Sequence, residues 1–209
     1  MKIIKKFFLS LSLFFFFFFI LFSYLVSKDI FNQLDFDITV KLQNKIPRSL
    51  DSYLSFLSIL GSFEILTGII FLIIFIRKKL ISVLIFIPFV IAHIIEIVGK
   101  LFLDHPGTPF MFHRYNLDFT LPSSYVKPGF SYPSGHSLRT VFISLLFSYL
   151  IIKSKKINNF LKIVLISFLL IFNFLMLLSR ISLGEHWTTD VIGGVLLGLS
   201  MAFLSYLFL

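Results

Sequence analysis

The 209-residue chain contains no cysteine. This absence excludes disulfide bonds and metal sites built on thiolates. Its ten acidic residues are not gathered into carboxylate clusters either, so we expect no metal and no other cofactor. The sequence shows no internal repeat and no sign of a second domain. We therefore expect residues 1–209 to form a single domain.

Apolar residues, by contrast, are abundant: they make up 57% of the chain, and it contains 30 Phe. The mean hydropathy is +0.97. A soluble domain has about 45–50% apolar residues, so this composition indicates an integral membrane protein. At about 20 residues per membrane-spanning helix, the length suits one all-α bundle of about six helices.

Apolar runs predict the spans, which are 7–26, 54–76, 80–101, 137–152, 160–179 and 189–209. For the first run the alternative is a secretory signal peptide, whose apolar core has about 7–15 residues before a small-residue cleavage site. The run 7–26 is longer and lacks an Ala-x-Ala-like exit, so we favour an uncleaved span. In the last span Gly194 and Gly198 form a small-xxx-small pair, which predicts close helix packing.

Positive charge is concentrated in short polar segments, although the net charge of +9 could also suggest a nucleic-acid partner. None of the ten acidic residues lies in these segments, whose basic residues are Lys2, Lys5, Lys6, Arg77, Lys78, Lys79, Lys153, Lys155, Lys156 and Lys162. This is the positive-inside pattern of a membrane protein rather than a nucleic-acid-binding face. We expect both termini to be cytoplasmic, together with 77–79 and 153–162.

The remaining segments, 27–53, 102–136 and 180–188, are then expected on the outer side of the cell inner (plasma) membrane. In residues 28–53, apolar residues recur near helical spacing, which predicts a short amphipathic helix on the membrane surface or an ordinary solvated helix. The segment 102–136 is long for a loop and contains five prolines. Those prolines argue for a shaped, functional extracytoplasmic loop rather than a long helix.

The most informative polar cluster runs from Ser179 to Asp190, between the last two spans. Arg180 can bind phosphate oxygens in bidentate fashion. His186 can attack or carry a proton, and Asp190, four residues later on the same helical face, can orient it. Gly184 is expected to end the fifth span, so that a new helix starts near His186 and offers N–H groups to phosphate. A snorkelling Arg and an interfacial His are the alternative, but these spacings favour phosphoryl chemistry.

A second cluster, Pro133-Ser134-Gly135-His136, lies at another membrane edge. Gly135 lets backbone N–H groups approach an anion, Ser134 can donate its hydroxyl, and His136 can protonate a leaving oxygen. Alone, this tetrapeptide is equally compatible with a plain turn before a helix. Paired with the 179–190 cluster, it predicts a phosphate site.

Lys100, at the outer end of the third span, is a further candidate for binding phosphate. Glu96 lies four residues earlier on the same face and can hold the lysine in place. Simple snorkelling is the alternative for Lys100. For His93 we favour a polar group satisfied inside the bundle.

These residues resemble the motifs of the type 2 phosphatidic acid phosphatase (PAP2) superfamily, membrane lipid phosphatases related to vanadium haloperoxidases. That family has three motifs: Lys-x6-Arg-Pro, Pro-Ser-Gly-His and Ser-Arg-x5-His-x3-Asp. The second is present at 133–136, and the third is complete from Ser179 to Asp190. The resemblance covers about residues 50–209, including the order of the motifs and the layout of the spans.

The first motif departs from the family pattern. Counting from Lys100, the family's Arg falls at Gly107 and its Pro at Thr108. The sequence does not choose among the candidates for the missing donor, which are His105, Arg114 and Arg139.

The resemblance implies a mechanism. His186 would attack phosphorus and form a phosphohistidine, while Asp190 would fix its tautomer. His136 would protonate the leaving group and then activate water. The groups that would stabilise the equatorial oxygens are Lys100, Arg180, Ser134 and the Gly135 amide.

We therefore expect metal-independent hydrolysis of a lipid phosphate or diphosphate at the outer membrane face, with undecaprenyl or another polyprenyl diphosphate as the first choice. Phosphatidic acid, phosphatidylglycerol phosphate and lipid A phosphates are alternative substrates. A lipid phosphotransferase that uses the same residues is a second alternative. A non-catalytic lipid transporter is a third, because intramembrane charges also mark transport paths.

Overall fold

The computed structural model describes residues 2–77, 80–119, 121–122 and 129–209. Over these ranges the chain is helical and contains no β-strand, which confirms the predicted all-α class. The α-helices are α1 (Lys2–Val26), α2 (Asn32–Lys45), α3 (Asp51–Leu60), α4 (Phe63–Arg77), α5 (Phe86–Phe102), α6 (Gly135–Lys153), α7 (Asn159–Ser182) and α8 (Thr188–Ser205). The 3-10 helices are η1 (Arg48–Leu50), η2 (Leu80–Ile85), η3 (Phe110–Phe112) and η5 (Tyr206–Phe208).

Among the described residues, 5 helices are long and apolar enough to cross a membrane, or up to 6 if the bent pair α3–α4 counts as one span. The predicted span 54–76 is therefore not one straight helix, because its two parts meet at 45°. The break lies at Gly61 and Ser62. A Cβ on Gly61 would lie 2.9 Å from the Met176 side chain and 3.0 Å from that of His136. Glycine thus lets the bend pack closely against α6 and α7.

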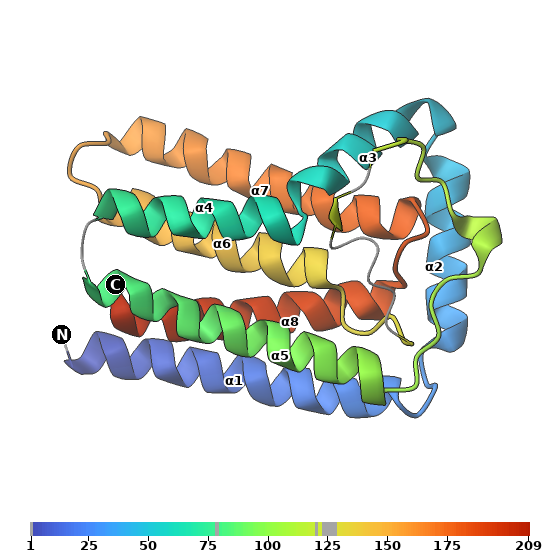
Figure 1. Cartoon of the computed structure of the whole chain (residues 1–209), viewed down its shortest axis with the longest axis horizontal. Helices are drawn as coiled ribbons and strands as arrows, with labels where there is room; N and C mark the ends of the chain where they lie inside the picture. Colours follow the sequence, from blue (N-terminus) through green and yellow to red (C-terminus); the bar gives the residue numbers. More distant parts are fainter. Residues whose placement is uncertain (1, 78–79, 120, 123–128) are drawn as a thin grey trace.

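Figure 1 shows α1 and α4 to α8 side by side in a bundle, with both termini at one end. The connection between α6 and α7 lies at that same end, whereas α2 crosses the opposite end. Both termini and the basic segment 153–162 therefore share one end, as the charge pattern predicts. Of the other basic segment, Lys78 and Lys79 lie outside the described residues.

The helix expected within 28–53 is α2, but the side that it turns to the bundle is polar. It packs against α7 and α8, and its buried residues are Asp35 and Thr39. Leu34 and Phe36 are exposed instead. Hydrogen bonds that involve Asp35 and Gln43 therefore help to hold α2 to the bundle, beside half-buried apolar residues such as Ile38 and Leu42.

The pairing of α6 with α8 brings the two motif-bearing helices together. A Cβ on Gly194 would overlap the main-chain oxygen of Ser134, and one on Gly198 would lie 2.7 Å from that of Leu138. These two glycines therefore let α8 approach the backbone of α6 closely, which confirms the packing predicted for them. The start of α6 is thereby placed against the start of α8.

Candidate active site

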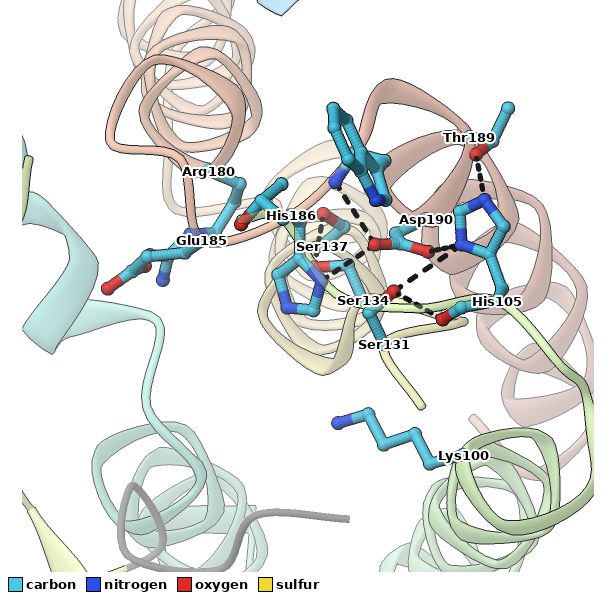
Figure 2. A network of polar contacts seen from close by, with 12 residues as sticks. Lys100, His105, Ser131, Ser134, Ser137, Arg180, Glu185, His186, Thr189 and Asp190 are labelled. Atoms are coloured by element: carbon cyan, nitrogen blue, oxygen red, sulfur yellow. Dashed lines mark hydrogen bonds and ion pairs between the residues drawn. The ribbon is translucent and has the colours of Figure 1, made fainter. Parts of the chain in front are cut away.

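His186 lies in the short connection between α7 and α8. Its Nδ1 donates to Oδ2 of Asp190 at 3.2 Å, and the main-chain N–H of Trp187 donates to the same oxygen at 3.0 Å. Asp190 is therefore both the first-turn cap of α8 and the partner of His186, as Figure 2 shows. With Nδ1–H bound in this way, Nε2 carries the lone pair that a nucleophile needs.

The imidazole of His186 is held in its uncharged form. Burial lowers its pKa below the ordinary value, the nearby charges of Lys100 and Arg180 lower it further, and the hydrogen bond to Asp190 opposes both. A lowered pKa leaves the ring neutral at pH 7. An attacking histidine must be in that state.

Gly184 gives this connection its shape. Its φ of +66° lies in the left-handed region that favours glycine. A Cβ at this position would overlap the carbonyl oxygen of Phe112. The hydroxyl of Thr108 donates to the carbonyl of Gly184. The segment that follows α5 is thus fastened directly to the connection that carries His186.

Arg180, in the last turn of α7, is a buried cation with a side chain 1% exposed. Its Nη1 donates to the hydroxyl of Ser58 on α3 at 2.7 Å, and its Nη2 forms an ion pair with Glu185. Its Nε has no hydrogen-bond partner among the described residues. A buried guanidinium with an uncommitted donor beside His186 is suited to binding an anion.

The segment that carries the second motif is held against α8 by its backbone. The main-chain N–H of Ser134 donates to the carbonyl of Asp190 at 2.9 Å, and its hydroxyl accepts from Ser137 at 3.1 Å. Gly135 opens α6, and a Cβ there would overlap the carboxylate of Glu96. Gly135 therefore lets an acidic side chain of α5 reach the backbone of α6.

His136, in the first turn of α6, lies beside the bend at Gly61. The charges of Arg180 and His186 act on its ring, so the three groups lie near one another. The structure thus brings together the residues of the second and third motifs, which are far apart in the sequence.

Lys100 belongs to an ion-pair network that is centred on Glu96. The lysine Nζ lies 2.7 Å from Oε1 of Glu96, and Nη1 of Arg139 lies 3.3 Å from Oε2. One carboxylate is therefore shared by two cations from α5 and α6. Nδ1 of His93 hydrogen-bonds the carbonyl of Phe89 at 2.8 Å, whereas its Nε2 is buried with no hydrogen-bond partner among the described residues, so the expected polar group inside the bundle is satisfied only in part. Figure 2 shows Lys100 reaching from α5 toward the side of the cluster where His186 lies.

The three candidates for the missing first-motif donor lie in different environments. Arg114 forms a two-bond ion pair with Asp51, at 2.7 and 3.0 Å, and also donates to backbone carbonyls in and just after α2. His105 is buried and donates to Asp190, on the side away from His186. Arg139 alone has a charge that acts on both His136 and Arg180. Its position favours Arg139 over the other two.

Sequence reasoning missed several polar residues of the site. No sequence pattern marked Ser58 and Glu185 as the partners of Arg180. Asp35 accepts from both the main-chain N–H and the hydroxyl of Thr189, at 2.9 and 2.6 Å. Asp35 and Thr39 stand one turn apart among apolar residues of α2, and that polar pair is the one available hint.

Among the described residues, no group of three or more His, Cys, Asp or Glu is arranged to hold a metal ion.

Comparisons with known sequences point to one family. The model of the PAP2 superfamily matches residues 53–209. An undecaprenyl-diphosphatase from Sulfolobus acidocaldarius is 34% identical over 140 residues. That match covers 64% of this chain and 58% of the relative, so the chain spans less than two thirds of that protein's length.

Solved structures share the fold. A transmembrane PAP2-type phosphatidylglycerolphosphate phosphatase from Bacillus subtilis superposes with a TM-score of 0.75 at 23% identity, over 94% of both chains. LpxE from Aquifex aeolicus superposes with a TM-score of 0.61 at 22% identity, over 83% of this chain and 94% of that one. With its apolar helices and this fold, the chain is a multi-pass membrane protein. It belongs to the PAP2 superfamily, as its second and third motifs predict.

Proposed function

We propose that this protein hydrolyses a phosphate monoester or diphosphate of a membrane lipid, with His186 as the nucleophile. One observation carries the proposal. The neutral imidazole of His186 is bound through Nδ1 to a fully buried Asp190, and the buried cation Arg180 lies beside it. This combination supplies a nucleophile, a group that orients it and a charge for the phosphate.

The reaction has two steps. In the first, Nε2 of His186 forms a bond to phosphorus, and the bond from phosphorus to the lipid oxygen breaks as His136 gives that oxygen a proton. In the second, His136 takes a proton from water, the water oxygen bonds to phosphorus, and the phosphorus–nitrogen bond breaks to release phosphate. Asp190 stabilises the cationic ring of the phosphohistidine between the steps.

Catalysis of this kind depends mainly on positioning and charge stabilisation. Arg180 offers its uncommitted Nε–H to an equatorial oxygen of the phosphoryl group. Lys100 supplies a second positive charge from the opposite side of the site. The hydroxyl of Ser134 and the main-chain N–H of Gly135 are the further donors that we assign to this group.

We assign a polyprenyl diphosphate as the first-choice substrate and the extracytoplasmic face as the side on which it is hydrolysed. The undecaprenyl-diphosphatase relative supports the substrate class. The positive-inside pattern supports the side, because the site lies at the end of the bundle opposite both termini. Phosphatidic acid, phosphatidylglycerol phosphate and lipid A phosphates are the alternatives.

The deciding experiment is phosphate release from a panel of these lipids by the full chain in detergent micelles. We expect release without an added acceptor, inhibition by vanadate, and no loss of activity in EDTA. His186→Ala is the negative variant, and His113→Ala, a change at an exposed loop histidine, is the matched control. No release from any lipid, or unchanged turnover in His186→Ala, would overturn the proposal. Transfer only to an added alcohol would instead indicate a phosphotransferase.

Sidedness has a separate test, because the chain has no native cysteine. We expect Lys45→Cys, at the end of α2, to react with a membrane-impermeant maleimide in intact cells. Lys155→Cys, between α6 and α7, should react only after the cells are broken. Both positions are exposed, so accessibility within the protein is matched. The reverse pattern would place the site on the cytoplasmic side.

A further inference from the structure

A chain of hydrogen bonds extends behind Asp190, away from the proposed phosphate site. Nδ1 of His105 lies 2.9 Å from Oδ1 of Asp190, the oxygen that His186 does not use. On the other edge of the ring, Nε2 of His105 lies 3.6 Å from Oδ2 of Asp35 and 3.4 Å from the hydroxyl of Thr189. His105 therefore stands between two carboxylates (Figure 2 shows its contact with Asp190).

This arrangement is built from distant parts of the chain. Asp35 comes from α2, His105 from the segment after α5, and Asp190 from the first turn of α8. All three are buried, at 2%, 3% and 0% exposure. Ser131 ties the backbone of the loop to His105, because its hydroxyl and its main-chain N–H both donate to the carbonyl of His105 at 3.0 Å. The imidazole is thus fixed in place from several sides.

His105 is positively charged in this setting. Burial alone would lower its pKa, but the hydrogen bond to Asp190, the close approach of the Asp35 carboxylate and the charges of both carboxylates outweigh it and raise the pKa to about 9. An imidazolium donates from both nitrogens, which matches one acceptor on each edge of the ring. Asp190 thereby accepts hydrogen bonds from His186, His105 and the Trp187 main chain.

We propose that His105, held by Asp35, is a positioning residue whose charge partly neutralises Asp190 and so keeps His186 uncharged and correctly oriented for attack. The inference rests on the proposed function for its catalytic consequence. Its physical basis is independent: a bare carboxylate beside His186 would favour the protonated ring, and protonation would remove the attacking lone pair. A second imidazolium on the same carboxylate weakens that effect.

Other charged side chains lie near His186 and His105, and the test variant leaves all of them unchanged. Those that act on His186, besides Asp190, are Lys100 on α5, Arg180 on α7 and His136 on α6. Asp190 and Asp35 are the charged groups that act on His105, and the Tyr132 ring packs against it. None of these groups is altered by replacing His105.

The first test is the pH profile of kcat/KM for His105→Gln, which keeps an N–H donor and removes the charge. The positive charge on His105 opposes a second positive charge on His186, and a repulsion of about 1.4 kcal/mol between two unit charges moves a pKa by about one unit. We therefore expect the acid limb, which reports His186, to move up by about one pH unit, so that kcat/KM falls by up to about tenfold at pH values below the wild-type limb. Asp35→Asn should leave the limb close to its wild-type position, because a His105 pKa lowered by about one unit from about 9 still leaves this ring charged on the acid side. His113→Gln, on the same loop and exposed, should keep the wild-type profile.

The second test does not depend on activity. Imidazole nitrogen NMR of the detergent-solubilised full chain should show His105 titrating near pH 9 and His186 neutral, with its proton on Nδ1, at pH 7. In His105→Gln the titration of His186 should move up by about one unit.

An unchanged His186 titration, or an unshifted acid limb, in His105→Gln would overturn the inference even if the wild type releases phosphate. Absence of phosphate release by the wild type with the shift intact would overturn only the proposed function. If His105→Gln does not fold, the same NMR measurement is made on Asp35→Asn. In that variant the pKa of His105 must fall by about one unit.

Discussion

The junction of α7 and α8 and the facing ends of α5 and α6 present their charges in different ways. At the junction one carboxylate orients the nucleophile: Asp190 accepts from His186 and from His105, while Arg180 is bound to Ser58 and Glu185. At the α5–α6 side, the carboxylate of Glu96 is shared by two cations, Lys100 and Arg139. The junction fixes the direction of a lone pair and adds the cation Arg180, whereas the α5–α6 side contributes positive charge alone.

This difference explains why the chain can keep one motif complete and vary another. Bond formation at phosphorus requires one nitrogen in one orientation, so the spacing of His186 and Asp190 leaves no freedom. Positive charge around a phosphate can be delivered by long side chains from different helices. Gly107, where the family has Arg, is exposed, and among the residues that the structure describes a Cβ there would have only Ser131 within 4.0 Å. The predictions below test this division between the two regions.

The largest effect is expected at the α7–α8 junction. Asp190→Asn keeps the size of the side chain but removes the acceptor that holds Nδ1–H of His186. We expect kcat to fall by about 10³-fold or more, because the ring is no longer kept in the attacking tautomer. Single-turnover phosphate release measures this, and a fall of less than tenfold would contradict the assigned role.

Arg180→Gln should come next. Removing one donor that acts on a developing charge costs about 10²–10³ in kcat. Because Arg180 is proposed to bind the transition state more tightly than the substrate, kcat should fall more than KM rises. Ser58→Ala removes only its hydroxyl partner and serves as the milder comparison. An equal loss in both variants would mean that Arg180 acts mainly through packing.

On the α5–α6 side, Arg139→Gln should lower kcat/KM by about tenfold, since one of several cations is lost there. Adding Gly107→Arg, which restores the family residue at an open position, should recover part of the loss. Arg114→Gln is the matched control: its donors are taken by Asp51 and by backbone carbonyls, so it should lower the unfolding temperature and leave kcat/KM unchanged. Failure of the second change to recover activity would argue against Arg139 as the replacement donor.

The remaining effect concerns folding stability rather than catalysis. His105 has a pKa raised from 6.5 to about 9. Its contribution to stability is therefore complete below pH 6.5 and is lost as the pH rises through about 9. The full contribution is about 3 kcal/mol. Thermal unfolding in detergent should show the wild type losing stability between pH 7 and 10, with a flatter profile in His105→Gln. Parallel profiles would contradict the charge assigned to this ring.

Much of the fold could be read from the sequence, since the bilayer demands helices of a minimum length and apolar composition. The bend between α3 and α4 could not be predicted from the sequence, because both halves are apolar. Only their contact with α6 and α7 places the bend at Gly61. The polar side of α2 was also missed. Its apolar residues recur near helical spacing, but that pattern does not say which side meets protein and which meets lipid.

By itself, the sequence determined the helical membrane class, the family and the pairing of His186 with Asp190. These depend on composition and on residues only four positions apart in the sequence, which local backbone geometry keeps close together. Only the tertiary structure decided that Asp35 and His105 stand behind Asp190, and that Glu96 is shared by two cations. Those contacts join residues far apart along the chain, and no local period marks such partners. The hydrogen bonds that hold the site together form only after the helices pack.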